Sequence, residues 1–310
     1  MPPLDPKNDV VFKLLFSREK RLLHSMLEAV LGEPIDEVEL LNPGIPGDLA
    51  NDKAIILDLR ALLSSGKRVN VEMQVGPGET LPQRFVYYAA TDYAAQLRRG
   101  EGYHQLEPTV SIVWAACIVV PDLTQLHEVF ELRGRETGLL HSDQLTFHVI
   151  HLANLDNPGQ AMNTALHRWA RFFAATSTQE LLQLAEEDAI MEAAKTALED
   201  LAQNPEARRL ADKREIDRKL YQYELAETAR RAAAAAEAET QRAEAETQRA
   251  EASLRRVTRR QLEARFGALP DWVDERIAQA SLAGLEAISE AAASPESTTV
   301  ESALQSAAKV

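Results

Sequence analysis

Residues 52–74 read DKAIILDLRALLSSGKRVNVEMQ, and they form two apolar runs separated by Ser64-Ser65-Gly66. The first run carries Asp58 in its middle, and the second ends in Glu72-Met73-Gln74. A carboxylate in apolar surroundings costs several kcal/mol unless charge or hydrogen bonds compensate for its lost hydration. Asp58 therefore requires a partner within the fold.

The two runs predict a β-hairpin. Alternation gives the second run two faces, an apolar one with Val69, Val71, Met73 and Val75 and a polar one with Asn70, Glu72 and Gln74. The first run, read as a strand from Ala54 to Leu63, places Asp58 on the same face as Arg60. Gly66 suits the last position of a three-residue loop, because the backbone there has a positive φ, which glycine adopts at least cost.

This loop determines the register of the hairpin. It gives four cross-strand pairs: Leu63 with Lys67, Arg60 with Asn70, Asp58 with Glu72, and Ile56 with Gln74. Paired residues have Cβ atoms roughly 4.5–5.5 Å apart, so the two carboxylates repel each other unless a cation lies between them. A two-residue loop of Ser65-Gly66 shifts the register by one residue and sends Asp58 and Glu72 to opposite faces. The loop length therefore decides whether the carboxylates meet.

A pair of carboxylates without nearby cysteine or histidine suits a hard cation, Mg²⁺ or Mn²⁺, rather than zinc. Such a site supports metal-assisted hydrolysis of a phosphodiester. The alternative is a structural ion pair on a solvated sheet face, of Asp58 with Arg60 or of Glu72 with Lys67.

Several segments in the first half of the chain resemble one known family. They are DVVFKLLF at 9–16, Asp52-Lys53, ILDL at 56–59, VNVEMQ at 69–74, RFVYY at 84–88, and GEGY at 100–103 with Pro108. In this order they resemble the recombination-promoting nuclease and putative transposase family of the PD-(D/E)XK nuclease superfamily. The resemblance implies an α/β (α+β) restriction-endonuclease-like core with a central mixed sheet. It also implies an endonuclease that acts on DNA and depends on Mg²⁺ or Mn²⁺.

The resemblance also implies roles for individual residues. Asp58 and Glu72 match metal-binding carboxylates, with the backbone carbonyl of Met73 as a further ligand. Gln74 takes the place of a lysine that, in many superfamily members, orients the attacking water or steadies the phosphate. Glutamine is common there in this family, but it removes a positive charge, for which Lys53 is a candidate substitute. Surface solvation is the alternative role for Lys53.

Three more residues are candidates with structural alternatives. Asp9 is a candidate third metal-binding carboxylate, although Asn8 or Asp9 equally suits the cap of a helix through Phe12 and Phe16. Gln83 and Arg84, at the start of a helix predicted over 83–99, are candidates for contact with a phosphate backbone. Both equally suit a solvated helix face.

Charge argues against the nuclease interpretation. The chain has 310 residues and a net charge of −14, and residues 1–155 hold 14 Lys and Arg against 21 Asp and Glu. A protein that holds DNA by its phosphates needs basic surface. We therefore expect DNA affinity to be weak and salt-sensitive, or to depend on a partner.

The predicted compartment is the cytoplasm. The N-terminus MPPLDP lacks the basic and apolar regions of a signal peptide, and no apolar run approaches the roughly 18 residues that span a bilayer. The single cysteine, Cys117, lies in an apolar run and suits a buried position in a reducing compartment.

Four regions are predicted along the chain: a nuclease-like domain at 1–155, a helical extension packing on it at 156–212, a long Ala/Glu/Arg helix at 213–257, and a small helical C-terminal domain at 258–310. In the first, further strands are expected at 109–120, 128–133 and 145–152. His148 and His151 on the last strand point to opposite faces, which favours packing or surface roles over metal binding. The second region is expected to hold helices at 162–175 and 178–202, closed by Pro205.

The long helix carries a heptad repeat. Ala236-Glu-Ala-Glu-Thr-Gln-Arg242 recurs at 243–249, and small residues spaced four and three apart make the thin seam of a weak coiled coil. A homo-oligomer through this helix is slightly favoured over a single-helix spacer. The Arg265-Phe266-Gly267 segment, followed by Leu269-Pro270, resembles a small uncharacterised domain attached to proteins of this family.

Two functions thus compete: a DNA endonuclease of the recombination-promoting type, and a catalytically silent scaffold that binds a protein partner through the same fold. Asp58, Glu72 and Gln74 favour the enzyme, whereas the acidic surface and the long helix favour the scaffold.

Overall fold

The computed structural model of the protein describes residues 3–42, 44–45, 55–56, 58–76, 78, 80–157, 164–295 and 297–305. The chain divides into two compact units, Met1–Lys219 and Leu220–Val310. No helix in the described ranges combines the length and the apolar composition needed to cross a membrane.

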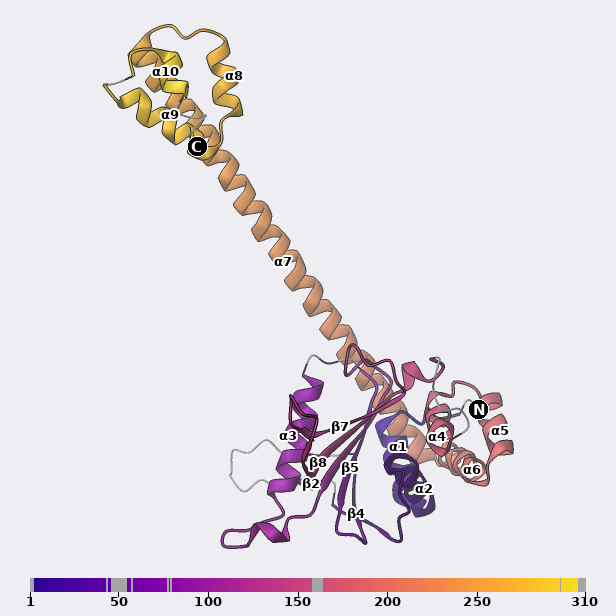
Figure 1. Cartoon of the computed structure of the whole chain (residues 1–310). Helices are drawn as coiled ribbons and strands as arrows, with labels where there is room; N and C mark the ends of the chain where they lie inside the picture. Colours follow the sequence, from indigo (N-terminus) through magenta and orange to yellow (C-terminus); the bar gives the residue numbers. More distant parts are fainter. Residues whose placement is uncertain are drawn as a thin grey trace. The chain divides into compact units, whose positions relative to one another are not determined.

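The first unit is built around a mixed sheet, six-stranded in the described part of the chain, with strand order β1-β4-β5-β6-β8-β7 (Figure 1). Its strands are β1 Val38–Leu40, β4 Leu59–Leu63, β5 Arg68–Gln74, β6 Thr109–Ala115, β7 His127–Arg133 and β8 Leu140–His151. β5, β6 and β8 run parallel, while β1, β4 and β7 are antiparallel to their neighbours. β6 occupies the first part of the strand predicted at 109–120, and all seven of its residues are buried, as in a strand that is covered on both faces.

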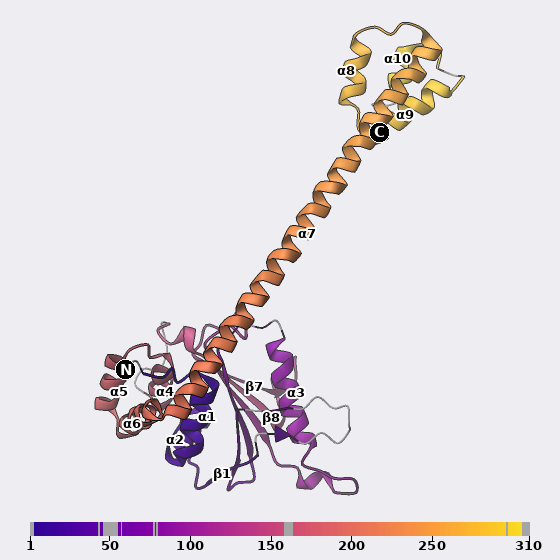
Figure 2. The ribbon, with the colours of Figure 1, turned by 180° about the vertical axis from the view of Figure 1, so that it is seen from behind.

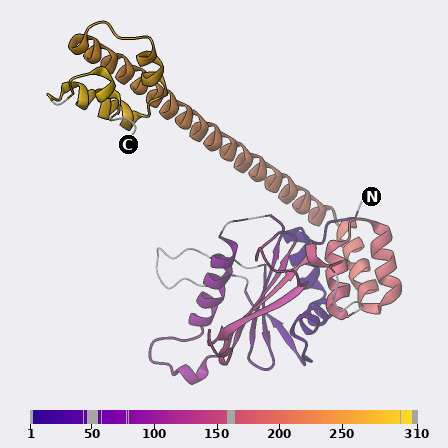
Figure 3. The same ribbon diagram turned by 45° about the horizontal axis from the view of Figure 1, so that its top comes forward.

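Helices cover both faces of this sheet. α3 (Leu81–Ala94) lies on one face, and α1 (Asp9–Arg18) and α2 (Lys20–Leu31) lie on the other (Figures 1 and 2). Beyond α1 and α2, three helices pack side by side (Figure 3): α4 Ala165–Ala174, α5 Thr178–Glu187 and α6 Ala189–Gln203. The sequence prediction of a mixed sheet in an α/β (α+β) core is confirmed.

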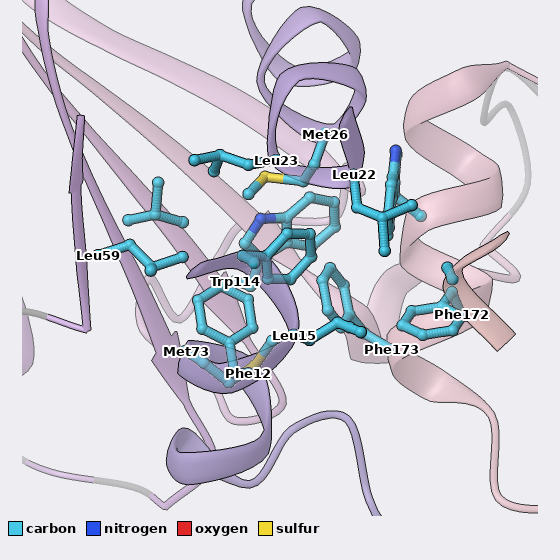
Figure 4. Packing of buried hydrophobic residues seen from close by; sticks show 14 of the residues in the cluster. Phe12, Leu15, Leu22, Leu23, Met26, Leu59, Met73, Trp114, Phe172 and Phe173 are labelled. Carbon is cyan, nitrogen blue, oxygen red and sulfur yellow. The ribbon is translucent and has the colours of Figure 1, made fainter. Parts of the chain in front are cut away.

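Aromatic side chains join these helices to the sheet. Phe173 of α4 lies 4.7 Å from Trp114 of β6 and 5.7 Å from Phe12 of α1 between ring centroids (Figure 4). All three side chains are fully buried, as is Trp169. The helices of the predicted extension therefore share one hydrophobic core with the sheet.

Polar residues set several element boundaries. The side chain of Asn8 accepts hydrogen bonds from Val10 N and Val11 N, so Asn8 caps α1. Asp188 accepts from Ile190 N and starts α6, which divides the predicted helix over 178–202 into two. α6 ends at Gln203, just before Pro205, so the helical unit closes there as expected, and Pro205 has a second role. It begins α7 (Pro205–Phe266), because Asn204 caps that helix and proline, which has no N–H, is tolerated in a first turn.

The start of the quoted hairpin also differs from expectation. Of the first apolar run, the part that pairs with β5 is Leu59–Leu63 (β4), whereas Ile55–Ile56 (β3) pairs with Gly44–Ile45 (β2) in a separate two-stranded sheet. Asp58 therefore lies at the entry to β4 rather than inside one continuous strand.

The second unit contains the rest of α7 with α8 (Trp272–Gln279), α9 (Leu282–Ala293) and α10 (Val300–Leu304). Leu262, Val273 and Leu285 lie at the centre of its own small core. Gly267, at φ 80°, ends α7 where the sequence predicts a helix end. The heptad seam from Ala236 to Ala250 is exposed.

Candidate active site

The hairpin adopts the register expected for a three-residue loop. Arg60 pairs with Asn70, and Leu63 N donates a hydrogen bond to Lys67 O at 3.0 Å. Gly66, at φ 87°, closes the loop, and its N–H donates to Leu63 O at 2.9 Å. The paired ladder begins at Leu59 and does not include the predicted pair of Ile56 with Gln74, since Ile56 pairs with Gly44 instead.

Two hydrogen bonds bring Asp58 and Glu72 together just beyond this ladder. Asp58 N donates to Glu72 Oε1 at 3.0 Å, and Met73 N donates to Asp58 Oδ2 at 2.9 Å. The Glu72 carboxylate thus accepts a hydrogen bond from the backbone of Asp58. The Asp58 carboxylate accepts one from the backbone of Met73, the residue after Glu72. The arrangement holds both side chains at the point where β4 begins and β5 ends.

Both carboxyl groups lie in surroundings that oppose negative charge. Glu72 is only 8% exposed, and Asp58 is half-buried. Burial raises the pKa of Asp58 to about 6 and that of Glu72 to about 8, and the Asp58 charge adds to the shift of Glu72. Backbone hydrogen bonds oppose both shifts. A pair with this electrostatic character gains by binding a cation.

The oxygen atoms of the pair are suitably disposed for such a cation. Within the part of the chain that is described, Asp58 Oδ1 and Glu72 Oε2 accept no hydrogen bond. The N–H and C=O of one strand residue point the same way, so the Met73 carbonyl faces the Asp58 side, as its N–H does. The next carbonyl, that of Gln74, points the other way and accepts from Ala116 N. Asp58 Oδ1, Glu72 Oε2 and the Met73 carbonyl are thus oxygen donors of the hard type that Mg²⁺ prefers.

Asp9 lies near this pair without joining it. Its charge raises the pKa of Asp58, but its Oδ2 accepts a hydrogen bond from Arg214 Nε at 2.6 Å. No group of three or more His, Cys, Asp or Glu side chains with metal-binding geometry occurs among the described residues. Asn8 is the cap residue of α1, and Asp9 Oδ1 also accepts a hydrogen bond from Val10 N in the first turn, at 3.0 Å.

Three cations surround the carboxylates. Each of them opposes the rise in pKa that burial causes. Lys13 of α1 acts in this way on both Asp58 and Glu72, Arg214 of α7 acts on Asp58, and Arg84 of α3 acts on Glu72. Lys13 and Arg214 were not foreseen from the sequence. For Lys13 a signal exists, because it is the one charged residue in the apolar run 10–16 and follows Asp9 by four positions. For Arg214, which is 205 positions from Asp9, we find none.

The side chain of Gln74 is engaged within the protein. Its Oε1 accepts from Arg84 Nη2 at 2.5 Å, and its Nε2 donates to Gly76 O at 2.5 Å. Of the other predicted substrate contacts, Gln83 is exposed on α3, and Lys53 lies outside the described residues. Tyr88 of α3 is half-buried, and burial together with the charges of Glu72 and Asp58 raises its pKa.

The polar face of the hairpin is not solvated. Asp92 of α3 is fully buried and bonds to the guanidinium of Arg60 and to Asn70 Nδ2, the latter at 3.1 Å. Arg60 therefore pairs with Asp92 rather than with Asp58, and Lys67 pairs with Glu33. The predicted alternative of a structural ion pair within the hairpin does not apply.

The two histidines of β8 have packing roles, as expected. His148 Nδ1 lies 3.0 Å from His127 Nε2 on the neighbouring strand, while His151 Nε2 accepts from Val119 N at 3.2 Å.

Comparison with known proteins gives one match. The family model described as PD-(D/E)XK nuclease family transposase matches residues 6–229. No curated protein and no solved structure matches the chain. The matched range contains the hairpin, α3 and the beginning of α7, which together carry the candidate site.

Proposed function

The chain belongs to the PD-(D/E)XK nuclease family of transposases, and on that premise we propose that it is a metal-dependent DNA endonuclease of the recombination-promoting type. The active site is assigned to Asp58, Glu72 and Gln74, with Mg²⁺ or Mn²⁺ as the cofactor. The observation that most supports this proposal is the pair of hydrogen bonds that joins Asp58 to Glu72 and Met73.

Asp58, Glu72 and the Met73 carbonyl would hold the cation. When bound, it supplies an activated water and neutralises charge on the scissile phosphate. Both carboxyl groups must lose their protons to act as ligands, so their raised pKa values make cation binding a proton-releasing step. Asp9 is the proposed third carboxylate, supported by its charge interaction with Asp58, and joining the site would require its ion pair with Arg214 to open.

The chain's own cations would hold the DNA. Lys13, Arg84 and Arg214 lie around the carboxylates and supply the local positive charge that the overall net charge of −14 lacks. Lys53 and Gln83 remain proposed contacts to the phosphate backbone. Because few cations contribute, we expect the binding to be weak and strongly salt-dependent.

The deciding experiment is cleavage of supercoiled plasmid DNA with Mg²⁺ or Mn²⁺, comparing the wild type with Asp58→Ala. Glu136→Ala is the matched control, because it also removes one carboxylate but from an exposed turn between β7 and β8. We expect the control to cleave at the wild-type rate and Asp58→Ala to be inactive. Equal cleavage by all three proteins would end the nuclease proposal at this site and return the scaffold as the better account.

Three further proposals concern the setting of the activity. The first is that the chain divides after residues 155, 212 and 257 into a nuclease-like domain, its helical extension, the long helix and the C-terminal module. The 213–257 helix is proposed to form a weak homo-oligomer, supported by its seven-residue repeat. The cytoplasm is the proposed compartment, supported by the unpaired Cys117.

A further inference from the structure

Gln74 stands at the end of β5 beside the carboxylates, yet its amide carries no charge to offer a phosphate. Both of its polar atoms already have partners, Arg84 Nη2 for Oε1 and Gly76 O for Nε2. The role that the structure gives Gln74 is therefore to hold another side chain.

That side chain is Arg84, which reaches the site from α3. Its guanidinium carbon lies 5.3 Å from the Phe85 ring centroid and 5.8 Å from that of Tyr88, distances at which a cation is attracted to an aromatic ring. Gln74 and the two rings thus restrict where the cation lies. Its charge reaches the carboxylate pair, because it opposes the rise in the pKa of Glu72 that burial causes.

Arg84 also has an unused donor. Its Nε is buried and has no hydrogen-bond partner among the described residues. Buried donors in proteins are nearly always paired, so the unpaired Nε near the carboxylate pair points to an acceptor that the described residues do not supply. A guanidinium offers its donors in a planar fork that matches two oxygens of a phosphate.

We propose that Arg84 is a catalytic residue that binds the scissile phosphate and offsets the negative charge developing on it, and that Gln74 is the positioning residue that orients Arg84. This inference rests on the proposed endonuclease function. Hydrolysis of a phosphodiester depends largely on positioning and on stabilising charge on the phosphoryl oxygens. Arg84, a cation held beside the carboxylate pair, can stabilise the charge on the phosphoryl oxygens.

The test compares Arg84→Met with the wild type. Methionine keeps a flexible apolar stem over Phe85 and Tyr88 but removes the charge and the donors. Arg135→Met is the matched control, since Arg135 is exposed between β7 and β8. We expect Arg84→Met to lower kcat on the order of 10²–10³-fold, the usual effect of losing one preorganised donor, with the control unchanged.

Two further readouts do not depend on cleavage. Duplex binding is measured with Ca²⁺ in place of Mg²⁺ over a range of salt concentrations, and loss of one phosphate contact reduces the slope of log K against log[salt] by about 0.9. Mn²⁺ binding without DNA should not weaken in Arg84→Met, because Arg84 repels the cation, whereas Asp58→Ala should lose it.

A compensating variant tests the position of the charge. Gln74→Lys combined with Arg84→Met places an ammonium near the point where the two native side chains meet, and we expect it to recover at least tenfold of the lost rate. Gln74→Leu releases Arg84 without removing it, and should lower kcat more than it changes KM. If Arg84→Met melts far below the wild type, Gln74→Leu and Arg84→Lys decide the matter by the same readouts.

The outcomes separate the two proposals. Arg84→Met could show the same kcat and the same salt slope as the wild type while Asp58→Ala is inactive. That result would overturn the role of Arg84 and leave the endonuclease proposal intact. Absence of cleavage by the wild type would overturn the endonuclease, and the Ca²⁺ binding data would then decide on Arg84, an unchanged salt slope counting against it. A protein that neither binds nor cleaves DNA would end both.

Discussion

The backbone N–H of Asp58 donates a 3.0 Å hydrogen bond to the Glu72 carboxylate, while the Asp58 carboxylate accepts one from Met73. Each acid is therefore held in place by the chain segment that carries the other. This reciprocal arrangement holds two acidic side chains together, and binding of a cation would offset the electrostatic cost of ionising both.

The metal-free protein should lose stability as the pH rises through the titration of this pair. The folded-state pKa of each acid is raised, so the stabilising contribution of the protonated forms is complete below the ordinary value of 3.8 and is lost as the pH approaches about 8. Glu72→Gln removes much of this dependence. At pH 8 it should raise the melting temperature by a few degrees, since 1 kcal/mol corresponds to about 2–4 °C in a protein of this size. Thermal melts of both proteins in EDTA, from pH 5 to pH 8, test this, and parallel curves would contradict it.

Binding of Mn²⁺ should release protons near neutral pH. The pKa of Glu72, about 8, leaves this carboxyl largely protonated at pH 7, so an incoming ion must displace a proton. Calorimetric titration in two buffers of different ionisation enthalpy measures the number of protons released per bound ion. We expect close to one proton at pH 7 and fewer at pH 9, with affinity rising over the same interval. Identical heats in both buffers at pH 7 would show that the pair is already ionised.

The hairpin loop can be tested with two glycines that share one backbone conformation. Gly66 has φ 87° and Gly138 has φ 68°, so alanine at either position costs roughly 1–2 kcal/mol. At Gly66 a Cβ also comes within 2.8 Å of the Glu107 side chain, whereas at Gly138 it meets nothing within 4 Å. Denaturant unfolding should therefore show similar losses, slightly larger for Gly66→Ala.

Activity should distinguish these two variants, and a deletion sharpens the contrast. Removing Ser65 leaves a two-residue loop, which shifts the register and separates Asp58 from Glu72. We expect cleavage to be abolished by the deletion, reduced by Gly66→Ala and unaffected by Gly138→Ala. Full cleavage by the deletion variant would mean that the register does not determine the site.

Asp92 should be essential for stability. It is 0% exposed and accepts hydrogen bonds from Arg60 and Asn70, so Asp92→Ala leaves the buried Arg60 guanidinium without its carboxylate partner. Breaking a buried ion pair from one side costs about 3–5 kcal/mol. Urea unfolding measures this loss, and Glu101→Ala, an exposed acid beyond α3, is the control expected to change stability by less than about 1 kcal/mol. A loss as small as that of the control would contradict the assigned role of Asp92.

Much of the core could be predicted from the sequence because its signals are local. Alternation in 69–75 and a glycine at position 66 specify which residues face each other across a hairpin of 15 residues or so, and the structure follows that register from Leu63 to Leu59. The extent of the first strand could not be predicted in this way. Ile55–Ile56 is apolar enough to continue β4, but it pairs with Gly44–Ile45, a partner that alternation within the hairpin cannot reveal.

The surroundings of the carboxylates depend on contacts distant in sequence. Arg84 meets Gln74 because α3 lies across the polar face of β4 and β5, and Arg214 meets Asp9 because α7 passes the start of α1. Neither contact follows from a residue spacing or a hydrophobic period in the sequence, so neither could be predicted from the sequence.

From the sequence by itself, a three-residue loop and strand alternation thus predicted that Asp58 and Glu72 meet, since both are short-range constraints. Only the tertiary structure decided which cations stand beside them. Helix placement follows from packing of the shared core, in which Phe12, Trp114 and Phe173 come from segments more than 150 residues apart at the extremes. A charged side chain on a helix surface reaches a site only where that packing brings it.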